Sequence, residues 1–511
     1  MTDTRRPRPR PAIPGFVRVP HSPRPAVPRS TRVVSAALAL TGLLAVSACS
    51  GDSKPAQQDG PAVTAEPAAL SPSPTPSPTP TDSPSGGVVR LTPDVMSRLD
   101  VAIKQVMSQA SIPGVIVGYT TPDGSYQRAF GVADKDAGTT MSPDLYMRIG
   151  GVTKTFTATA VLRLLEQGKL GLDDPITTYV PNVPGGDGIT LRQLGEMRSG
   201  LFNYTLDPDF QQAYLNDPNR PFTPDQLLAY AFKHPVNFAP DARFEYSDTN
   251  LILLGLVVEK AGGQPLPDFL NQQVFTPAGL TKTSLPTDAA FPDPHAHGYT
   301  NQTQSGAVED SSTWNPSWGW AAGAAISNLA DLQTWSKVLA TGEPLLKPAT
   351  QAERLKFKAV GTAPDVGYGF GVFTAHGWIG HNGSLPGYES VVLYLPQAQA
   401  GLAILLNTDI EHDGSEPSTS LAQAITQIVS PDNVYTVPAP PASGSPTASP
   451  TASPTASPSP AVSPTASPTA SPSPAVSPTA SPSPLVSPTA TTPPAATTPA
   501  VPTGTATLHV S

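Results

Sequence analysis

The sequence of 511 residues contains one cysteine, Cys49, so the chain cannot form an internal disulfide bond and its fold must rest on its hydrophobic core. It lacks a Gly-x-Ser-x-Gly segment, which excludes the nucleophile elbow of α/β-hydrolases. It also lacks a His-x-x-x-His segment and a pair of cysteines, which are common zinc-binding patterns. We therefore expect no metal ion and no other cofactor.

Positive charge is scarce outside the first 48 residues. That segment carries eight arginines and one acidic residue, a net charge of +7, while the whole chain has a net charge of -9. Once that segment is removed, the remaining chain carries a net charge of -16. An acidic body of this kind does not attract nucleic acid, so we expect no nucleic-acid partner.

The apolar run at 33–48 has the features of an export signal. It follows the arginine-rich segment, ends in small residues, and is shorter than the roughly 20 residues that a membrane-spanning helix needs. Val46-Ser47-Ala48-Cys49 resembles a bacterial lipobox, which implies cleavage before Cys49 and acylation of its thiol. We expect a signal peptide at 1–48 and an exported protein, lipid-anchored to the outer face of the bacterial cell membrane in the cell envelope. A plain signal peptide with an incidental cysteine is the alternative.

Proline and glycine define the domain limits. The chain has 64 prolines and 41 glycines, and the prolines concentrate at its two ends. Residues 49–87 are predicted to be a lipidated N-terminus and a Pro/Ser/Thr linker with extended polyproline II character. Residues 438–511 are rich in Pro, Ala, Ser and Thr and have no apolar face to bury, so they predict a disordered tail. The remaining residues, 88–437, suffice for one large folded domain.

Local patterns within this domain predict a mixed α/β (α+β) fold with an antiparallel sheet. Thr92 as N-cap and Pro93 in the first turn indicate the start of a helix. Pro122-Asp123-Gly124 is typical of a hairpin between two strands. Few regular signals are visible between the second and third helices. The other predicted elements are strands at 114–120, 126–132, 387–395 and 401–407, and helices at 152–167, 249–261 and 418–429.

Three short segments hold the candidate site. Gly151-Val152-Thr153-Lys154 lies at the start of a predicted helix, which places residues 151 and 154 one turn apart. Tyr246-Ser247-Asp248 comes directly before another predicted helix, and His381-Asn382-Gly383 ends a strand-like stretch. The N-terminus of a helix favours negative charge developing nearby, so the first segment suits a reaction with an anionic intermediate.

These segments, in this order, resemble the S-x-x-K, Y-x-N and Lys/His-Thr-Gly motifs of penicillin-recognising serine enzymes. The most similar groups are class C β-lactamases, D-alanyl-D-alanine carboxypeptidases and related esterases. The similarity runs from about 88 to 431 and includes 189–201 and the small-residue stretch at 322–327, which resembles a strand of the family. It implies a β-lactamase/transpeptidase-like fold, with an antiparallel sheet flanked by helices and an all-helical lobe.

The resemblance also implies roles for single residues. Position 151 would hold the nucleophile, and Lys154 and Tyr246 would be catalytic residues that move its proton. The substrate-binding residues would be Asp248, His381, Asn382 and Gly383. A cation at His381 would hold a substrate carboxylate, and an unperturbed imidazole, with a pKa near 6.5, would be partly charged at neutral pH. Gly383 would let the substrate backbone lie alongside the strand.

The chain departs from the family pattern at two of these positions. Gly151 stands where the family has its nucleophilic serine, and Asp248 stands where it usually has asparagine. Loss of the nucleophile costs about 10⁶ in turnover in a measured serine protease. Thr153 and Ser199 are the candidate replacements, but a helix would turn Thr153 away, and Ser199 lies in a segment that is structural in the family. The missing hydroxymethyl group would leave room for a ligand beside Gly151.

Three hypotheses follow. In the first, the domain is a pseudoenzyme that binds a peptidoglycan stem peptide, a β-lactam or an ester small molecule without acylation. In the second, it is an active carboxypeptidase, β-lactamase or esterase that uses activated water or a replacement nucleophile. In the third, it is a structural protein of the cell envelope. The sequence leaves open whether Trp318 and Trp320 line the cleft or pack in the core.

Overall fold

A computed structural model describes residues 87–437, and within them nine strands form one antiparallel sheet. The sheet brings the two ends of the domain sequence together, because β1 pairs with β13. This confirms the predicted antiparallel sheet. In spatial order the strands are β3 (Thr139–Thr140), β2 (Gly124–Asp134), β1 (Gly114–Thr121), β13 (Ala400–Leu406), β12 (Tyr388–Leu395), β11 (Trp378–Leu385), β10 (Phe373–Ala375), β9 (Val366–Tyr368) and β8 (Lys358–Ala359).

Two tight hairpins set the register of the long strands. The β1–β2 hairpin closes at the pair Thr121 and Gly124, so the predicted turn is confirmed. The β11–β12 hairpin closes at the pair Leu385 and Tyr388. Every residue of β12 and β13 is buried, as expected for strands whose two faces are both covered.

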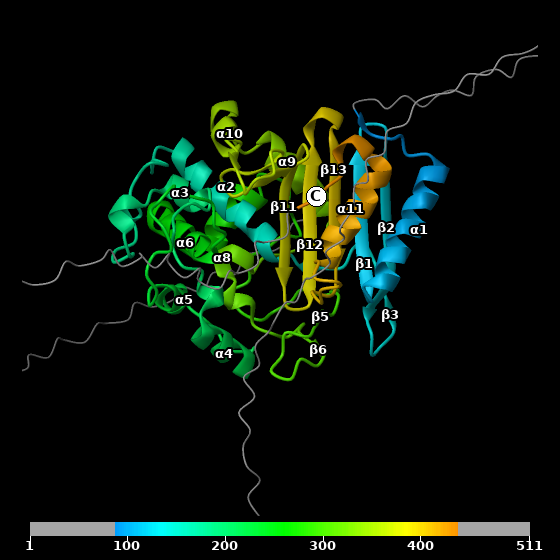
Figure 1. Ribbon diagram of the computed structural model, residues 1–511, viewed down its shortest axis with the longest axis horizontal. Helices are drawn as coiled ribbons and strands as arrows, with labels where there is room; N and C mark the ends of the chain where they lie inside the picture. The colour runs from blue at the N-terminus through cyan, green and yellow to red at the C-terminus, as the bar shows by residue number, and fades with distance from the viewer. Residues whose placement is uncertain (1–86, 438–511) are drawn as a thin grey trace, which may run out of the picture. The chain divides into compact units, whose positions relative to one another are not determined.

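Helices cover both faces of the sheet (Figure 1). On one face α11 (Pro417–Val429) packs on β12 and β13, and α1 (Pro93–Gln109) packs against α11. The start of α1 is as predicted, with the Thr92 side chain accepting a hydrogen bond from the backbone N–H of Val95. On the opposite face α9 (Leu329–Thr341) packs on the same central strands.

A lobe of short helices lies beside the sheet (Figure 1). The region between the second and third predicted helices was expected to show little regular structure, but it forms three helices. Two of them begin with a capping box, a sequence signal for helix starts, at Thr190 with Gln193 and at Thr223 with Gln226. The helices of the lobe are α3 (Leu191–Gly195), α4 (Pro208–Asn216), α5 (Pro224–Ala231), α6 (Asp248–Gly262), α7 (Leu266–Leu270), α8 (Trp320–Gly323) and α10 (Pro348–Arg354).

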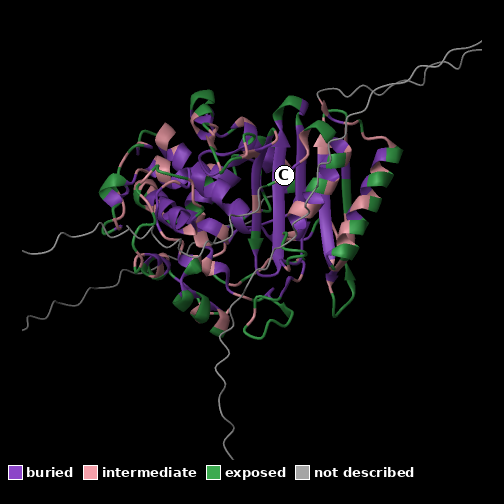
Figure 2. Ribbon diagram, in the orientation of Figure 1, coloured by how far each residue is buried: buried purple, intermediate pink, exposed green. Residues whose placement is uncertain are grey.

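Helix α2 (Thr153–Glu166) lies between the sheet side and the lobe. It packs against α6 and α8, and most of its residues are buried (Figure 2). The indole N–H of Trp335 on α9 donates to the hydroxyl of Thr155, which fixes α2 against the layer on the sheet. The start of α2, which carries Lys154, is therefore held between α6 and α8 of the lobe and α9 on the sheet.

The stretch 322–327 was expected to be a strand, and this is wrong for its first part. Residues Trp320–Gly323 form α8, and only Ile326–Ser327 form a strand, β7, which pairs with β4 (Met147–Arg148). The small residues allow α8 to pack closely on α2 and α6. The last short pair is β5 (Tyr299–Thr300) with β6 (Glu309–Asp310).

Within the described part of the chain, no helix is both long and apolar enough to cross a membrane. The predicted signal peptide, the lipidation site at Cys49, the linker apart from its last residue and the C-terminal tail all lie outside residues 87–437, so these four expectations stay predictions.

Candidate functional site

A glycine turn leads into α2 at the candidate nucleophile position. Gly150, with φ of +48°, adopts a conformation that side chains rarely take, and Gly150–Val152 form one 3-10 turn before α2 begins. The hydroxyl of Ser390 on β12 donates to the carbonyl of Ile149 at 2.8 Å, which ties this turn to the sheet. Lys154 follows in the first turn of the α-helix, so residues 151 and 154 lie on consecutive helical turns.

Lys154 is almost fully enclosed. Its residue surface is 3% exposed, and its Nζ donates to the carbonyl of Ala322 at 2.8 Å. The same nitrogen lies 2.7 Å from Oδ1 of Asp248, and it faces the ring of Tyr246 with 5.0 Å to the ring centroid. A carbonyl, a carboxylate and an aromatic face therefore surround the ammonium group. No hydroxyl in residues 87–437 forms a hydrogen bond with it.

Asp248 is the first residue of α6, where the helix dipole stabilises a negative charge. Asn203 holds it from the neighbouring loop: the backbone N–H of Asp248 donates to Oδ1 of Asn203 at 3.2 Å, and Nδ2 of Asn203 donates to Oδ2 of Asp248 at 3.4 Å. The Asp248 side chain remains 17% exposed and Tyr246 is 39% exposed. These two groups are thus the parts of the cluster that solvent can reach.

The third segment lies in the second half of β11, where alternate residues face opposite sides of the sheet. His381 and Gly383 face α2. Asn382 faces α11, and its Nδ2 donates to Oε2 of Glu416 at 3.1 Å. The structure therefore brings His381 and Gly383 to the site with Gly151, Lys154, Tyr246 and Asp248, whereas the Asn382 side chain points away from them.

His381 is buried, and both of its ring nitrogens have partners inside the protein. It is 1% exposed, one ring nitrogen is 3.1 Å from the hydroxyl of Tyr368, and the other is 2.5 Å from the carbonyl of Asn382. Burial, with the nearby charge of Lys154, lowers the pKa of His381 to about 3. The imidazole is therefore neutral at pH 7 in this enclosure, and the role of His381 toward a substrate carboxylate stays a prediction.

Strand β11 packs directly on residue 151. A Cβ placed on Gly151 would lie 2.8 Å from the backbone oxygen of Asn382 and 3.4 Å from Cα of Gly383. A Cβ on Gly383 would in turn lie 2.5 Å from the backbone nitrogen of Gly151. The expectation that the missing side chain leaves room for a ligand is therefore wrong, because the strand fills that space.

Both candidate replacement nucleophiles are buried and bonded elsewhere. The hydroxyl of Thr153 accepts a hydrogen bond from the backbone N–H of Ala325 at 3.0 Å. The hydroxyl of Ser199 donates to Oδ1 of Asn250 at 2.6 Å. Their relative exposures are 0% and 1%, so neither hydroxyl is presented to a ligand.

The two tryptophans pack within the lobe. Trp318 contacts Phe210 and Tyr214 in an aromatic cluster. The ring of Trp320 lies against Gly255 of α6, where a Cβ would come within 2.7 Å of it. Both are only partly buried.

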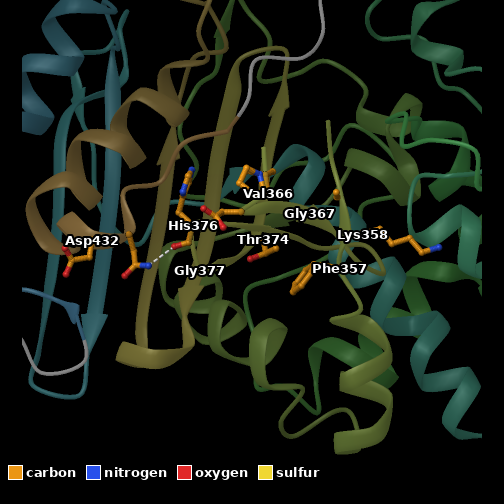
Figure 3. A pocket seen from close by; sticks show the side chains of 12 residues that line it. Phe357, Lys358, Val366, Gly367, Thr374, His376, Gly377 and Asp432 are labelled. Carbon is orange, nitrogen blue, oxygen red and sulfur yellow. Dashed lines mark hydrogen bonds between the residues drawn. The ribbon is translucent and has the colours of Figure 1, made fainter. Parts of the chain in front are cut away.

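A separate cavity of about 660 Å³ lies over the far end of the sheet, at β9 and β10 (Figure 3). Phe357 and Lys358 lie on one side of it, and His376 and Asp432 lie on the other. No residue of the three motifs lines it. Within residues 87–437, no group of three or more His, Cys, Asp or Glu side chains is arranged to hold a metal ion.

Sequence reasoning missed three residues that shape this cluster. Asn203 and Glu416 carry no motif and lie far along the chain from their partners, Asp248 and Asn382. Ala322 acts through its backbone carbonyl, which any residue type supplies. Short sequence motifs thus identify the ionisable groups, while their hydrogen-bond partners become visible only in the fold.

The antiparallel sheet, the helical lobe and the Lys154 cluster at their junction define a serine-hydrolase-like domain of the penicillin-recognising type. The family model described as Beta-lactamase matches residues 99–425, and the chain belongs to the β-lactamase family.

Several characterised proteins are similar to this chain. A D-stereospecific amidohydrolase from Streptomyces sp. is 31% identical with a TM-score of 0.59, and the match covers 65% of this chain and 97% of that one. The D-amino acid amidase from Ochrobactrum anthropi SV3, in complex with D-phenylalanine, is 25% identical with a TM-score of 0.57, covering 65% and 97%. Protein flp of Staphylococcus aureus (strain MRSA252) is 26% identical over 335 residues, which are 63% of this chain; the chain spans 65% of that relative's length.

Proposed function

We propose that this chain is an exported, lipid-anchored protein of the bacterial cell envelope. Its β-lactamase-family domain binds amide, lactam or ester ligands without forming an acyl-serine intermediate. The observation that carries the proposal is the surrounding of Lys154: its Nζ contacts the carbonyl of Ala322 and the carboxylate of Asp248, and residue 151 has no side-chain oxygen. A nucleophile needs a hydroxyl and a base within hydrogen-bond reach of each other.

The two candidate replacement hydroxyls also argue against an acyl-enzyme intermediate. Thr153 and Ser199 are buried and hydrogen-bonded inside the domain, so a replacement nucleophile would require local rearrangement. A water route needs a base that is free to accept a proton, whereas Lys154 donates to the carbonyl of Ala322 and is ion-paired with the Asp248 carboxylate. The hypothesis of an active hydrolase therefore finds no support in these contacts.

The class of ligand is inferred from the relatives. One similar structure, at 31% identity, is named a D-stereospecific amidohydrolase, and another is named a D-amino acid amidase. The accessible groups of the present site, the Tyr246 ring and the Asp248 carboxylate, suit a small polar ligand with an apolar or cationic part. Amides of amino acids have both features.

The test uses the purified full chain with D-phenylalanine amide. We expect the amide to raise the melting temperature in a concentration-dependent manner, because a ligand that binds only the folded state stabilises it. We also expect no release of ammonia above the rate of a buffer control. Ammonia release would establish the active hydrolase, and a melting temperature that no amide, ester or lactam changes would favour the structural envelope protein.

A further inference from the structure

Within residues 87–437, the site offers no available positive charge that could pair with the carboxylate of a ligand. His381 is neutral at pH 7 and both of its nitrogens have partners inside the protein. The Lys154 side chain is 4% exposed and its charge is compensated by Asp248 at 2.7 Å. Neither His381, expected to be the cation that holds a carboxylate, nor Lys154 is free to meet a negative charge on a ligand.

The groups that solvent reaches have the opposite character. The Asp248 side chain is 17% exposed, and within residues 87–437 the one hydrogen bond to its Oδ2 is the long 3.4 Å contact from Asn203. The residue beside it, Tyr246, is 39% exposed. The Lys154 end of this ion pair is enclosed and the Asp248 end is more exposed, so the pair presents its negative side, next to an aromatic face, to a ligand. This arrangement favours an ammonium group over a carboxylate at the same place.

We propose that this site selects ligands by charge: it takes amino acid amides that carry a free amine, it disfavours ligands that end in a carboxylate, and Asp248 is the residue that sets this preference. The inference rests on the proposed function and narrows its ligand class. It also replaces the expectation of a peptide with a free carboxyl terminus. Asp248 acts on the ligand directly through its exposed oxygen and indirectly by compensating the charge of Lys154.

The experiment compares D-phenylalanine amide with D-phenylalanine, which differ only in the terminal group. Isothermal titration calorimetry on the full chain at pH 7 should give a dissociation constant at least tenfold lower for the amide. The Asp248→Asn variant removes the repelling charge and leaves the Lys154 cation uncompensated, so its affinity for D-phenylalanine should rise at least tenfold. Asp225→Asn is the matched control, since Asp225 is an exposed acid in the first turn of α5 and should leave both affinities unchanged.

The outcomes separate the two proposals. Equal affinities of the wild-type chain for the two compounds would overturn the charge selection and leave ligand binding intact. Absence of binding by either compound, and by uncharged esters, would overturn the proposed function itself. The wild-type comparison needs no variant, so the test stands even when Asp248→Asn lowers the stability of the fold.

Discussion

The Nζ of Lys154 lies 2.7 Å from Oδ1 of Asp248, and this ion pair joins the start of α2 to the start of α6. The two substitutions relative to the family pattern meet here. Residue 151 offers no hydroxyl to the lysine, and residue 248 offers it a carboxylate instead of an amide. In the family pattern the lysine contacts the hydroxyl of the nucleophile, whereas here it pairs with the Asp248 carboxylate. This ion pair compensates the buried charge of Lys154 in the absence of a nucleophile.

Gly151 is predicted to be required for the packing of β11. An alanine Cβ would lie 2.8 Å from the backbone oxygen of Asn382, which cannot move without the strand. Gly151→Ala should therefore lower the free energy of unfolding by about 1–3 kcal/mol, measured by urea denaturation. Gly124→Ala is the control, because a Cβ there meets nothing within 4 Å. Equal stability of the two variants would show that the strand is not in contact with residue 151.

The buried imidazole of His381 is predicted to make the free energy of unfolding depend on pH. Burial lowers its pKa to about 3, while the unfolded chain has an imidazole pKa near 6.5, so the unfolded state binds more protons between these values. The contribution of His381 is fully present above about pH 6.5 and is lost by about 1.4 kcal/mol per unit as the pH falls. His381→Gln should show a shallower loss of stability between pH 6.5 and 5, whereas the exposed His412→Gln should behave as the wild type. Identical slopes for all three proteins would contradict the buried, neutral imidazole.

The buried carboxyl group of Glu389 is predicted to lower the stability of the fold at neutral pH, whereas His381 lowers it at acidic pH. It is 1% exposed beneath α11, and burial, together with the nearby charge of Glu416, raises its pKa well above the usual value. A raised carboxyl pKa costs stability once the pH exceeds the value in the unfolded chain, about 4.3. Glu389→Gln should be more stable than the wild type at pH 7, by about 1 kcal/mol or more, and should lose that advantage at pH 4. Glu309→Gln, at an exposed position, should show no such change.

Much of the fold could be predicted from local patterns. Thr92 and Pro93 define the start of α1, Pro122-Asp123 defines the first hairpin, and the apolar runs define β12 and β13. These signals are local, and in this fold the tertiary packing agrees with them. The short helices α4 and α5 were missed although their first turns contain Asp207-Pro208 and Thr223-Pro224, which are ordinary helix-start signals.

The site was predicted less completely, for a physical reason. The motifs place Gly151, Lys154, Tyr246, Asp248 and His381 near one another, but they do not give burial or hydrogen-bond partners. The neutrality of His381 follows from Tyr368 and from the strand around it, and the closure of the space at Gly151 follows from the carbonyl of Asn382. The burial of His381 and the filled space at Gly151 both depend on how β11 packs against the start of α2. No local sequence pattern predicts that packing.

The N-terminal prediction has its own test. Lipidation at Cys49 predicts that the chain, produced in a bacterium that processes lipoproteins and fed an alkyne-tagged fatty acid, carries the tag and fractionates with the membrane. Cys49→Ser should abolish both, because no other cysteine is present. A wild-type chain that is exported without the tag would indicate a plain signal peptide.

The most direct test of the central claim is covalent labelling. In this chemistry a serine oxygen at position 151 attacks the lactam carbonyl, the ring C–N bond breaks, and the hydroxyl proton passes to the ring nitrogen through the basic group beside it. The wild-type full chain, Gly151→Ser, and Gly151→Ser with Asp248→Asn are each incubated with a fluorescent penicillin. Intact mass gives the adduct and its rate of formation.

The account predicts no adduct on the wild-type chain. It predicts the adduct on the double variant, where the backbone of β11 has to shift away from residue 151 to admit the serine Cβ. It predicts a rate at least tenfold lower for Gly151→Ser alone, because there Asp248 still holds Lys154 and repels the penicillin carboxylate. An adduct on the wild-type chain would contradict the account, and mapping the labelled peptide would then identify the nucleophile that the chain uses.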